Sequence, residues 1–483
     1  MTPPATEKAG MLEKFFHLTE RGSSIGQEIR GGLVTFFAMA YILVLNPIIL
    51  SGQDSTGAFL GGGSEPNQAA IAAGTALVAG FMTILMGGIA NFPIGIAAGL
   101  GLNSMVAATI VQIPGMTWAD GMGIIVLEGI VVVLLVLTGL REAIFRAVPK
   151  YLRTAISVGI GMFITLVGLV NAGMVRPGTG TPLSFAVNGS ISSWPLTIFI
   201  VGLFLTAILM ARRVQGAILI GIFVSTVLAV IMEAVAHIGA AGADNPGGWS
   251  LTVPALSGSP LQLPDFSTLG EFSIVGPFQK IGLIAVVVLA FSVMLADFFD
   301  TMGTMVAVAT EGDLLDEEGN PEGTSKILLV DSLGAIAGGL GGVSSNTSFV
   351  ESSAGVADGA RTGLSSVVTG LAFLLATLFA PLVAVVPNEA AAPALVAVGF
   401  LMMQQARDIE WEDLVTAIPA FLTIVMMPFG YSMTVGIGVG FIAHVVLQSA
   451  VGRAKKIHPL VWLVAVLFVI YFLMEPLQAL LNV

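Results

Sequence analysis

The chain has 483 residues, of which 55% are hydrophobic and only 10% are charged, and its formal net charge is −12. This apolar share exceeds that of soluble domains. Apolar stretches of about twenty residues, each long enough to cross a bilayer as a helix, recur along the whole sequence. The composition therefore predicts an all-α, polytopic integral membrane protein. Cysteine is absent, which excludes disulfides and thiol catalysis, and the four histidines are too scattered to form a metal site.

Hydropathy predicts about fourteen transmembrane segments in two sets of seven, separated by a polar, Pro- and Gly-rich connection at about 239–277. The expected segments of the first set are 31–50, 69–90, 93–112, 119–140, 154–174, 195–212 and 216–238. Those of the second set are 279–309, 325–343, 344–358, 363–387, 390–406, 413–430 and 432–449. Residues 1–30 are polar and carry no cleavable signal pattern, so we expect the first helix to be retained. A last apolar stretch at 459–480, within a C-terminal region 451–483, predicts a peripheral helix that either spans or lies on the membrane.

The positions of Lys and Arg predict the orientation in the membrane, because short cytoplasmic loops are enriched in these residues. Basic residues before the first segment put the N-terminus in the cytoplasm, and the later basic loops then fall on the same side. These residues are Lys8, Lys14, Arg21, Arg30, Arg141, Arg146, Lys150, Arg153, Arg212, Arg213, Lys326, Arg361, Arg453, Lys455 and Lys456. Seven spans per half would make the two halves inverted relative to each other, which is the plan of many secondary transporters. We expect a multi-pass protein of the plasma or inner membrane.

The third segment of each half is unusual for a membrane helix. The first, FPIGIAAGLGLNSMVAATI, contains Pro93 and several glycines, and the second, GGLGGVSSNTSFVESSAG, has too short an apolar part to span. Extended backbone is tolerated at membrane depth only where it is buried in protein or lines a cavity. Matched broken segments indicate a binding site, although close helix packing through small residues is the alternative for each one alone. We expect two broken half-helices, segments 3 and 10, to meet near the midplane.

Buried carboxylates mark the expected site. Asp300 in LADFFDTMGT and Glu351 in SNTSFVESSAG lie in or beside strongly apolar stretches, where a charge is costly and usually functional. Asp297 and Thr304 share a helix face with Asp300, since residues three and four apart are neighbours. Glu128 is a third buried acid, which either lines an ion route or joins two helices. Further expected ligands of a neutral substrate are Asn103, Ser345, Thr347 and Ser348.

Other residues near these acids have simpler interpretations. Phe298, Phe299 and Phe349 are able to stack on a planar ring, although ordinary packing is the more economical explanation. Asp331 is expected at a helix end or facing a loop. Arg141 and Arg361 are expected to anchor the membrane interface.

The segments MAYILVLNP, AAGLGLNS, DFFDTMGT and SFVESSAGVADGARTGLSSVVTG resemble the AzgA-like purine permeases of the nucleobase–ascorbate (xanthine/uracil) permease superfamily, from about residue 14 to 450. This resemblance implies a seven-plus-seven inverted repeat, with a core domain formed by 31–140 and 279–387 and a gate domain formed by 141–238 and 388–450. It also implies a homodimer joined through gate domains. The family's site residues match Asn103, Asp300 and Glu351. Ala98, Leu100, Ser104 and Asn346 depart from the family pattern and leave the preferred purine open.

The resemblance implies import of hypoxanthine, adenine or guanine coupled to protons, with Asp300, Glu351, Asp297 and Glu128 as candidates for carrying the proton. Two alternatives keep the fold and change the substrate: a uracil or xanthine permease, or an anion transporter. A cation channel is a further alternative, because rings of acids select cations. The sequence contains no nucleophile–base pattern, so we expect no enzyme activity and no cofactor. We expect the partners to be a small purine base, protons and the lipid bilayer, with no nucleic acid.

Overall fold

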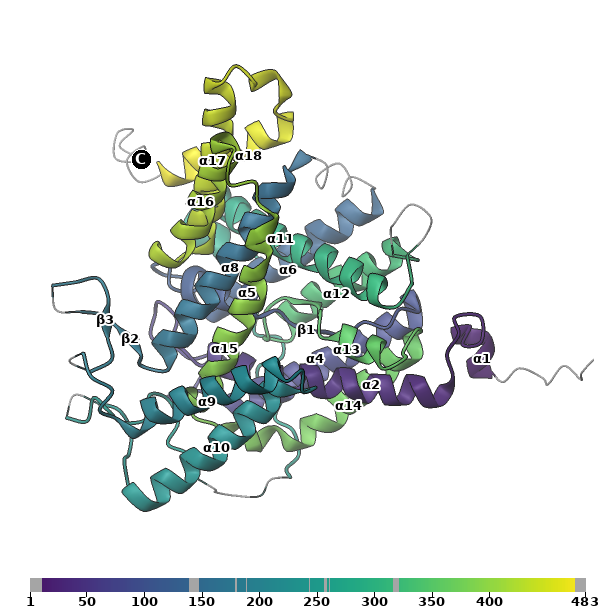
Figure 1. Cartoon of the computed structure of the whole chain (residues 1–483). Coiled ribbons are helices and arrows are strands. Elements are labelled where there is room, and N and C mark those ends of the chain that lie inside the picture. Colours follow the sequence, from purple (N-terminus) through teal and green to yellow (C-terminus); the bar gives the residue numbers. More distant parts are fainter. Residues whose placement is uncertain are drawn as a thin grey trace, which may run out of the picture.

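The computed structural model describes residues 11–138, 147–178, 180–187, 189–242, 244–255, 259, 261–315 and 321–473. These residues form helices joined by short strands and loops (Figure 1). In the first half the helices are α1 (Met11–Phe16), α2 (Ile25–Met39), α3 (Ile42–Ile49), α4 (Gln68–Leu85) with η1 (Met86–Ala90), α5 (Leu100–Met105) with η2 (Val106–Ile110), α6 (Trp118–Leu137), α8 (Lys150–Asn171), α9 (Trp194–Ala211) and α10 (Ala217–Ala236). In the second half they are α11 (Gly276–Glu311), α12 (Thr324–Leu340), α13 (Ser352–Ala357), α14 (Gly363–Ala376) with η3 (Thr377–Val385), α15 (Asn388–Met403) with η4 (Gln404–Asp408), α16 (Leu414–Phe429), α17 (Met433–Ala450), η5 (Ala454–Lys456) and α18 (Pro459–Phe472).

The membrane assignment agrees with these helices. Within the described residues, nine helices are long and apolar enough to cross a bilayer alone, and shorter apolar helices accompany them. The count of fourteen segments stays a prediction. Part of the last predicted helix, beyond residue 473, lies outside the described residues, and so does the predicted interface anchor Arg141.

Two helices differ from their expected form. The first begins at Ile25 rather than near residue 31, because the Ser24 hydroxyl accepts a hydrogen bond from the backbone N–H of Gln27 and caps it. This helix is also interrupted between α2 and α3, which brings Tyr41 to the break. The long α11 contains a non-helical residue, Gly282, with a φ of 78°. Its ψ of 169° makes the backbone extended at positive φ, a conformation that glycine adopts without the steric cost that other residues meet.

The helices form two bundles that mix the halves of the sequence (Figure 1). In the first bundle, defined here as α2–α6 with α11–α14, α12 packs against α6 and α14 packs against α4 and α2. In the second bundle, defined as α8–α10 with α15–α17, α15 packs against α8 and α9, and α16 packs against α8 and α17. In the first bundle the second helix of each half therefore contacts the fourth helix of the other half. This exchange is the arrangement expected of an inverted repeat.

Two half-strands meet inside the first bundle. β1 (Ile96–Ala98) pairs antiparallel with β4 (Asn346–Ser348), with Ala97 opposite Thr347. The ladder continues beyond the strands, since Gly99 N–H donates to Ser345 O and Phe349 N–H donates to Gly95 O, both at 2.9 Å. These bonds satisfy the extended backbone away from water, as the membrane interior requires. The short helices α5 and α13 then lead away from the strands. The expectation that segments 3 and 10 meet as broken half-helices is confirmed.

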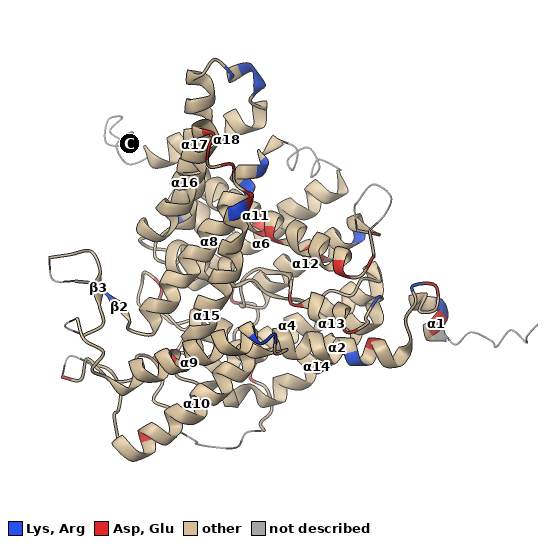
Figure 2. Cartoon of the chain, in the orientation of Figure 1, with Lys and Arg blue, Asp and Glu red and all other residues tan. Residues whose placement is uncertain are grey.

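A second small sheet lies outside the bundles. It pairs β2 (Val175–Arg176) antiparallel with β3 (Ser184–Phe185), in the connection between α8 and α9. Charged residues gather mainly in such connections and at helix ends (Figure 2). Glu28, in the first turn of α2, is fully buried, and its carboxylate accepts hydrogen bonds from the backbone N–H groups of Arg361, Thr362 and Ser365. It thereby caps α14, where a negative charge is favourable.

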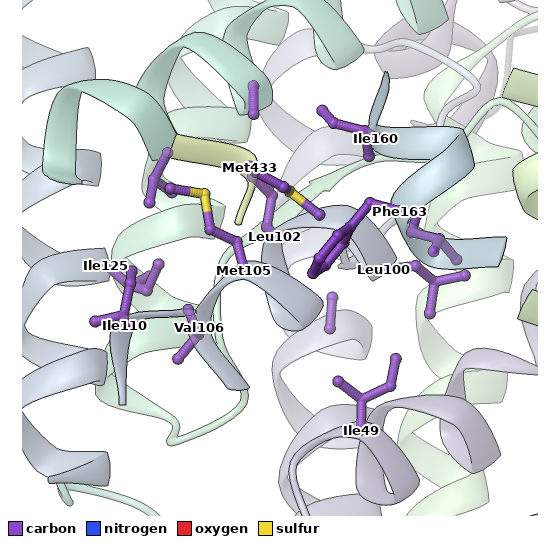
Figure 3. Packing of buried hydrophobic residues seen from close by; sticks show 14 of the residues in the cluster. Ile49, Leu100, Leu102, Met105, Val106, Ile110, Ile125, Ile160, Phe163 and Met433 are labelled. Carbon is purple, nitrogen blue, oxygen red and sulfur yellow. The ribbon is translucent and has the colours of Figure 1, made fainter. Parts of the chain in front are cut away.

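Buried apolar side chains fill the space where α5 and η2 approach the second bundle (Figure 3). Leu102 and Met105 belong to the same buried cluster as Ile160 and Phe163 of α8 and Met433 of α17. These contacts are between apolar groups on both sides. They therefore hold the two bundles together without fixing one relative position through directional bonds.

Candidate functional site

A cavity of about 90 Å³ lies between the two bundles, beside the paired half-strands. The first bundle contributes its polar lining from α11, from β4 and the turn that follows it, and from the break between α2 and α3. The second bundle contributes apolar side chains only. The residues used in the argument below are Tyr41, Leu100, Leu102, Asp300, Thr304, Thr347, Ser348, Phe349 and Glu351 from the first bundle, and Ile160, Ile164, Val398 and Met402 from the second. No Lys or Arg of the described chain is among the lining residues.

Asp300 and Thr304 enter the cavity from α11. They are four residues apart and therefore lie on the same face of the helix. Asp297, which the same spacing predicts beside them, is fully buried and does not line the cavity. The α11 face thus presents one carboxyl and one hydroxyl to the space between the bundles.

Glu351 enters from the turn between β4 and α13. Its carboxylate accepts a hydrogen bond from the hydroxyl of Tyr41, which is fully buried at the α2–α3 break. The Tyr41 and Phe349 rings lie 6.4 Å apart between centroids, at an angle of 47°. Sequence reasoning missed Tyr41, because nothing local to MAYILVLNP reveals a partner 310 residues away. The aromatic hydroxyl in an otherwise apolar segment was the available signal.

β4 is held in place by Asp331 of α12. The Asp331 carboxylate accepts hydrogen bonds from Ser348 N–H at 2.9 Å, from Ser348 Oγ at 2.8 Å and from Thr301 Oγ1 at 2.8 Å. Thr301 Oγ1 also lies 2.7 Å from Thr347 Oγ1. The expectation that Asp331 faces a loop or ends a helix is wrong, because it lies in the middle of α12 and is 1% exposed. It fixes the strand that presents Thr347 and Ser348 to the cavity.

Glu128 and Asp297 form a second buried acidic region behind β4. Both are almost completely buried, and Ser345 Oγ donates to Glu128 Oε2 at 3.5 Å. Three of their carboxyl oxygens, Asp297 Oδ1, Asp297 Oδ2 and Glu128 Oε1, have no hydrogen-bond partner within the described residues. Buried oxygens of this kind are costly unless they bind a proton, an ion or water. Ser345, which binds Glu128, directly precedes β4 in the chain.

Asn103 does not line the cavity. It is fully buried in α5, and its side-chain Nδ2 donates to Asn46 Oδ1 at 2.6 Å. Asn46 in turn donates to Thr75 Oγ1 at 2.8 Å and to the backbone carbonyl of Val343 at 3.1 Å. This network joins α3, α4, α5 and the segment before β4. Substrate contact by Asn103 stays a prediction.

The aromatic residues divide into two groups. Phe349 lines the cavity beside Glu351. Phe298 and Phe299 do not line it, and their rings contact each other edge to face with centroids 5.2 Å apart. Arg153 of α8 lies over the Phe299 ring at 5.9 Å. Of these three phenylalanines, Phe349 is the one placed to cover a planar ligand, and the other two pack between helices.

The fold is that of a membrane transporter. Two half-strands pair antiparallel inside an inverted helical repeat, and a cavity lies between the two bundles. The solved structures that resemble this chain support the same fold. The transmembrane domain of the cyanobacterial bicarbonate transporter BicA matches with a TM-score of 0.57 and 16% identity, covering 88% of this chain and 97% of that one. Murine Slc26a9, an anion transporter, matches with a TM-score of 0.59 and 11% identity, covering 94% of this chain and 74% of that one. At these identities the likeness concerns the fold alone.

The family follows from sequence comparison. The model of the xanthine/uracil permeases, described as "Permease family", matches residues 26–439, and the chain belongs to this family. The guanine/hypoxanthine permease PbuG of Bacillus subtilis is 39% identical over 465 residues, covering 96% of this chain and 99% of the relative. The adenine permease AdeP of Escherichia coli is 37% identical over 468 residues, covering 96% of each. The chain is a transporter and not an enzyme.

Proposed function

We propose that the protein imports purine nucleobases such as hypoxanthine, adenine or guanine by proton symport with alternating access. The observation that carries the proposal is the position of Asp300 and Glu351 in one cavity between two bundles, beside the Phe349 ring. Nearly full-length relatives named as guanine/hypoxanthine and adenine permeases support the substrate class.

The chemistry of the cavity suits a planar, neutral base. A carboxylate accepts hydrogen bonds from N–H groups, and a purine presents such groups along its edge. Glu351, already oriented by Tyr41, is the proposed acceptor. The Thr304 hydroxyl both donates and accepts, and Phe349 covers the ring face. The Thr347 and Ser348 hydroxyls, whose protons go to Thr301 and Asp331, offer acceptor oxygens. Asn103 is retained as a proposed specificity residue that acts through α5.

Asp300 is the proposed proton carrier. It shares the cavity with Glu351 and lies three residues from Asp297, and like charges close together favour proton binding between them. Such acids titrate as a set, so Glu128 and Asp297 behind β4 and Glu351 in the cavity remain the other proposed members of the proton pathway.

Alternating access follows from the unequal lining of the cavity. All of its polar groups belong to the first bundle, while Ile160, Ile164, Val398 and Met402 of the second bundle offer an apolar face. The first bundle is therefore proposed to carry base and proton as the core domain, moving against the second as the gate domain. We propose a homodimer joined through the second bundles, which would keep their apolar face fixed while the first bundles move. The protein is proposed to lie in the cell membrane with its N-terminus in the cytoplasm.

The deciding experiment compares counterflow with gradient-driven uptake of hypoxanthine in proteoliposomes. Asp300→Asn should still exchange base across the membrane, because an amide donates and accepts hydrogen bonds, but it should not accumulate base in response to a proton gradient. Glu351→Gln should weaken both activities at low hypoxanthine concentration, because the base binds less tightly, and Glu128→Gln tests the acid behind β4. If Asp300→Asn still concentrates hypoxanthine down an imposed proton gradient, Asp300 is not the carrier.

The substrate class is tested separately. Hypoxanthine and adenine should compete with labelled purine for uptake by the unaltered protein, while uracil, xanthine and sulfate should not. Competition by sulfate would favour an anion transporter, and competition by uracil or xanthine would favour the related permeases. Current carried by cations without added base would favour a channel.

A further inference from the structure

A second, larger cavity lies away from the proposed purine site. It has a volume of about 730 Å³ and is formed where α8 begins, α17 ends and the chain turns into α18. By the charge distribution this end of the molecule faces the cytoplasm. We propose that this cavity binds the phosphate-bearing headgroup of an anionic membrane lipid. The proposal does not depend on the nature of the transported substrate.

The cations of the cavity come from one short connection. Arg453, Lys455 and Lys456 follow α17 directly and all line the cavity. Gly452, with a φ of 77°, reverses the chain, and the short helix η5 then holds the three side chains close together. In the part of the chain that the structure describes, no Asp or Glu forms an ion pair with any of them. Three neighbouring positive charges without a carboxylate partner favour binding of a multivalent anion such as a phosphate group.

Neutral polar groups form the inner wall of the same cavity. The Tyr151 hydroxyl of α8 is hydrogen bonded to His444 Nδ1 of α17, and His444 is only 5% exposed. Gln448 lies one turn after His444 on the same face of α17. The wall therefore adds hydrogen-bonding groups to the three cations of the cavity, as recognition of phosphate or glycerol oxygens requires.

The position of α18 favours a lipid over a soluble phosphate compound. α18 begins at Pro459, which also lines the cavity, and its 14 described residues are strongly apolar. Leu463 and Val466 are at least half exposed, and Trp462 is 38% exposed on the same helix. A headgroup in the cavity would thus continue into acyl chains lying along α18, with the tryptophan at the membrane interface. Basic pockets between membrane helices on the cytoplasmic side are suited to acidic headgroups.

The test measures lipid retained by the purified full-length protein. Protein in neutral detergent is mixed with phosphatidylglycerol or phosphatidylcholine, and bound lipid is counted by native mass spectrometry. We expect retention of phosphatidylglycerol, and the triple variant Arg453→Gln, Lys455→Gln, Lys456→Gln should bind it at least about tenfold more weakly, because each cation near an anionic lipid surface contributes separately. The matched control is Arg212→Gln with Arg213→Gln, an exposed basic pair after α9 that does not line the cavity. It should retain the lipid like the unaltered protein.

Several results would overturn the proposal. An equal loss in the Arg212 and Arg213 control would mean that diffuse surface charge, and not the cavity, attracts the lipid. Displacement of phosphatidylglycerol by millimolar inorganic phosphate would assign the site to a soluble anion. Unchanged retention in the triple variant would remove the site. If the triple variant melts at a lower temperature than the control, the three single Gln variants, each expected to show a graded loss, replace it.

Discussion

The two half-strands have the same backbone arrangement and opposite chemistry. β1 consists of Ile96, Ala97 and Ala98, whereas β4 consists of Asn346, Thr347 and Ser348. Each is fixed by a side chain of a neighbouring helix. Thr83 of α4 receives Ile96 N–H at 2.9 Å and donates to Ile96 O at 3.0 Å. Asp331 of α12 accepts two hydrogen bonds from Ser348 of β4 and one from Thr301 of α11.

This difference indicates how an inverted repeat is divided between structure and chemistry. Backbone pairing needs no particular side chains, so both halves keep a half-strand that pairs with the other. Only one of the two half-strands has to supply side chains that bind the substrate. Leu100 and Leu102 follow β1 into the cavity, while Phe349 and Glu351 follow β4. We therefore expect substitutions on the β4 side to change transport, and matched substitutions on the β1 side to change mainly stability.

The largest effect is expected for Glu351→Gln. The variant keeps the side-chain volume but loses the charged acceptor, and a hydrogen bond to a charged group contributes about 1.5–3 kcal/mol. Hypoxanthine affinity should therefore fall by roughly 10- to 100-fold, since 1.4 kcal/mol corresponds to a factor of ten. Uptake at low substrate and surface expression are the measurements. Glu389→Gln, which changes another buried carboxyl that lies outside the cavity, is the matched control. Normal uptake by Glu351→Gln would contradict its role.

Asp331→Ala should come next. It leaves Ser348 N–H and the Thr301 and Ser348 hydroxyls without their acceptor, and each buried unsatisfied group costs about 1–3 kcal/mol. We expect a lower melting temperature together with about tenfold weaker uptake, and partial rescue of both by Asp331→Asn. Thr83→Ala on the β1 side should lower the melting temperature without changing the apparent affinity for hypoxanthine. Equal loss of affinity in both variants would mean that the two half-strands contribute alike.

The sequence predicts the fold and part of the site. The paired broken segments and the acids Asp300 and Glu351 were identified locally, because glycines, prolines and charges in apolar surroundings are visible along the chain. The partners were not. Tyr41 meets Glu351 and Asp331 meets Ser348 only after the helices pack, and helical periodicity gives the face of a residue but not its neighbour. Asn103 has the position in its motif that the family implies, yet its amide bonds to Asn46.

Asn103→Ala separates two roles for that amide. If Asn103 selects the base, the competition profile among hypoxanthine, adenine and guanine should change by a few-fold while the maximal rate changes little. If it only joins helices through Asn46, the melting temperature should fall and the profile should stay the same. Asn46→Ala breaks the same hydrogen bond from the other side and serves as the control. An identical, unchanged profile in both variants would remove Asn103 from the proposed specificity residues.

The smallest effect is expected outside the bundle interior, at Asp54 in the connection between α3 and α4. Burial alone would raise the pKa of Asp54, but hydrogen bonds from Thr56, Ala58 and the backbone N–H of Trp118 outweigh it and lower the pKa below its usual value. A carboxyl with a lowered folded-state pKa stabilises the fold above its unfolded value of about 3.9, and this contribution is lost as pH falls through the folded value.

Asp54→Asn should therefore lower the melting temperature at pH 7, by an amount that corresponds to about 1–2 kcal/mol, and the difference from the unaltered protein should shrink as pH falls below about 4. Thermal melts between pH 7 and pH 3 are the measurement. Asp265→Asn, at an exposed carboxylate whose pKa is also lowered, should change the melting temperature less. Because Asp54 contacts neither half-strand, saturated hypoxanthine uptake at pH 7 should be unchanged. If the difference in melting temperature grew toward low pH, the predicted sign of the pH dependence would be wrong. If uptake were lost, residues away from β4 would also control transport.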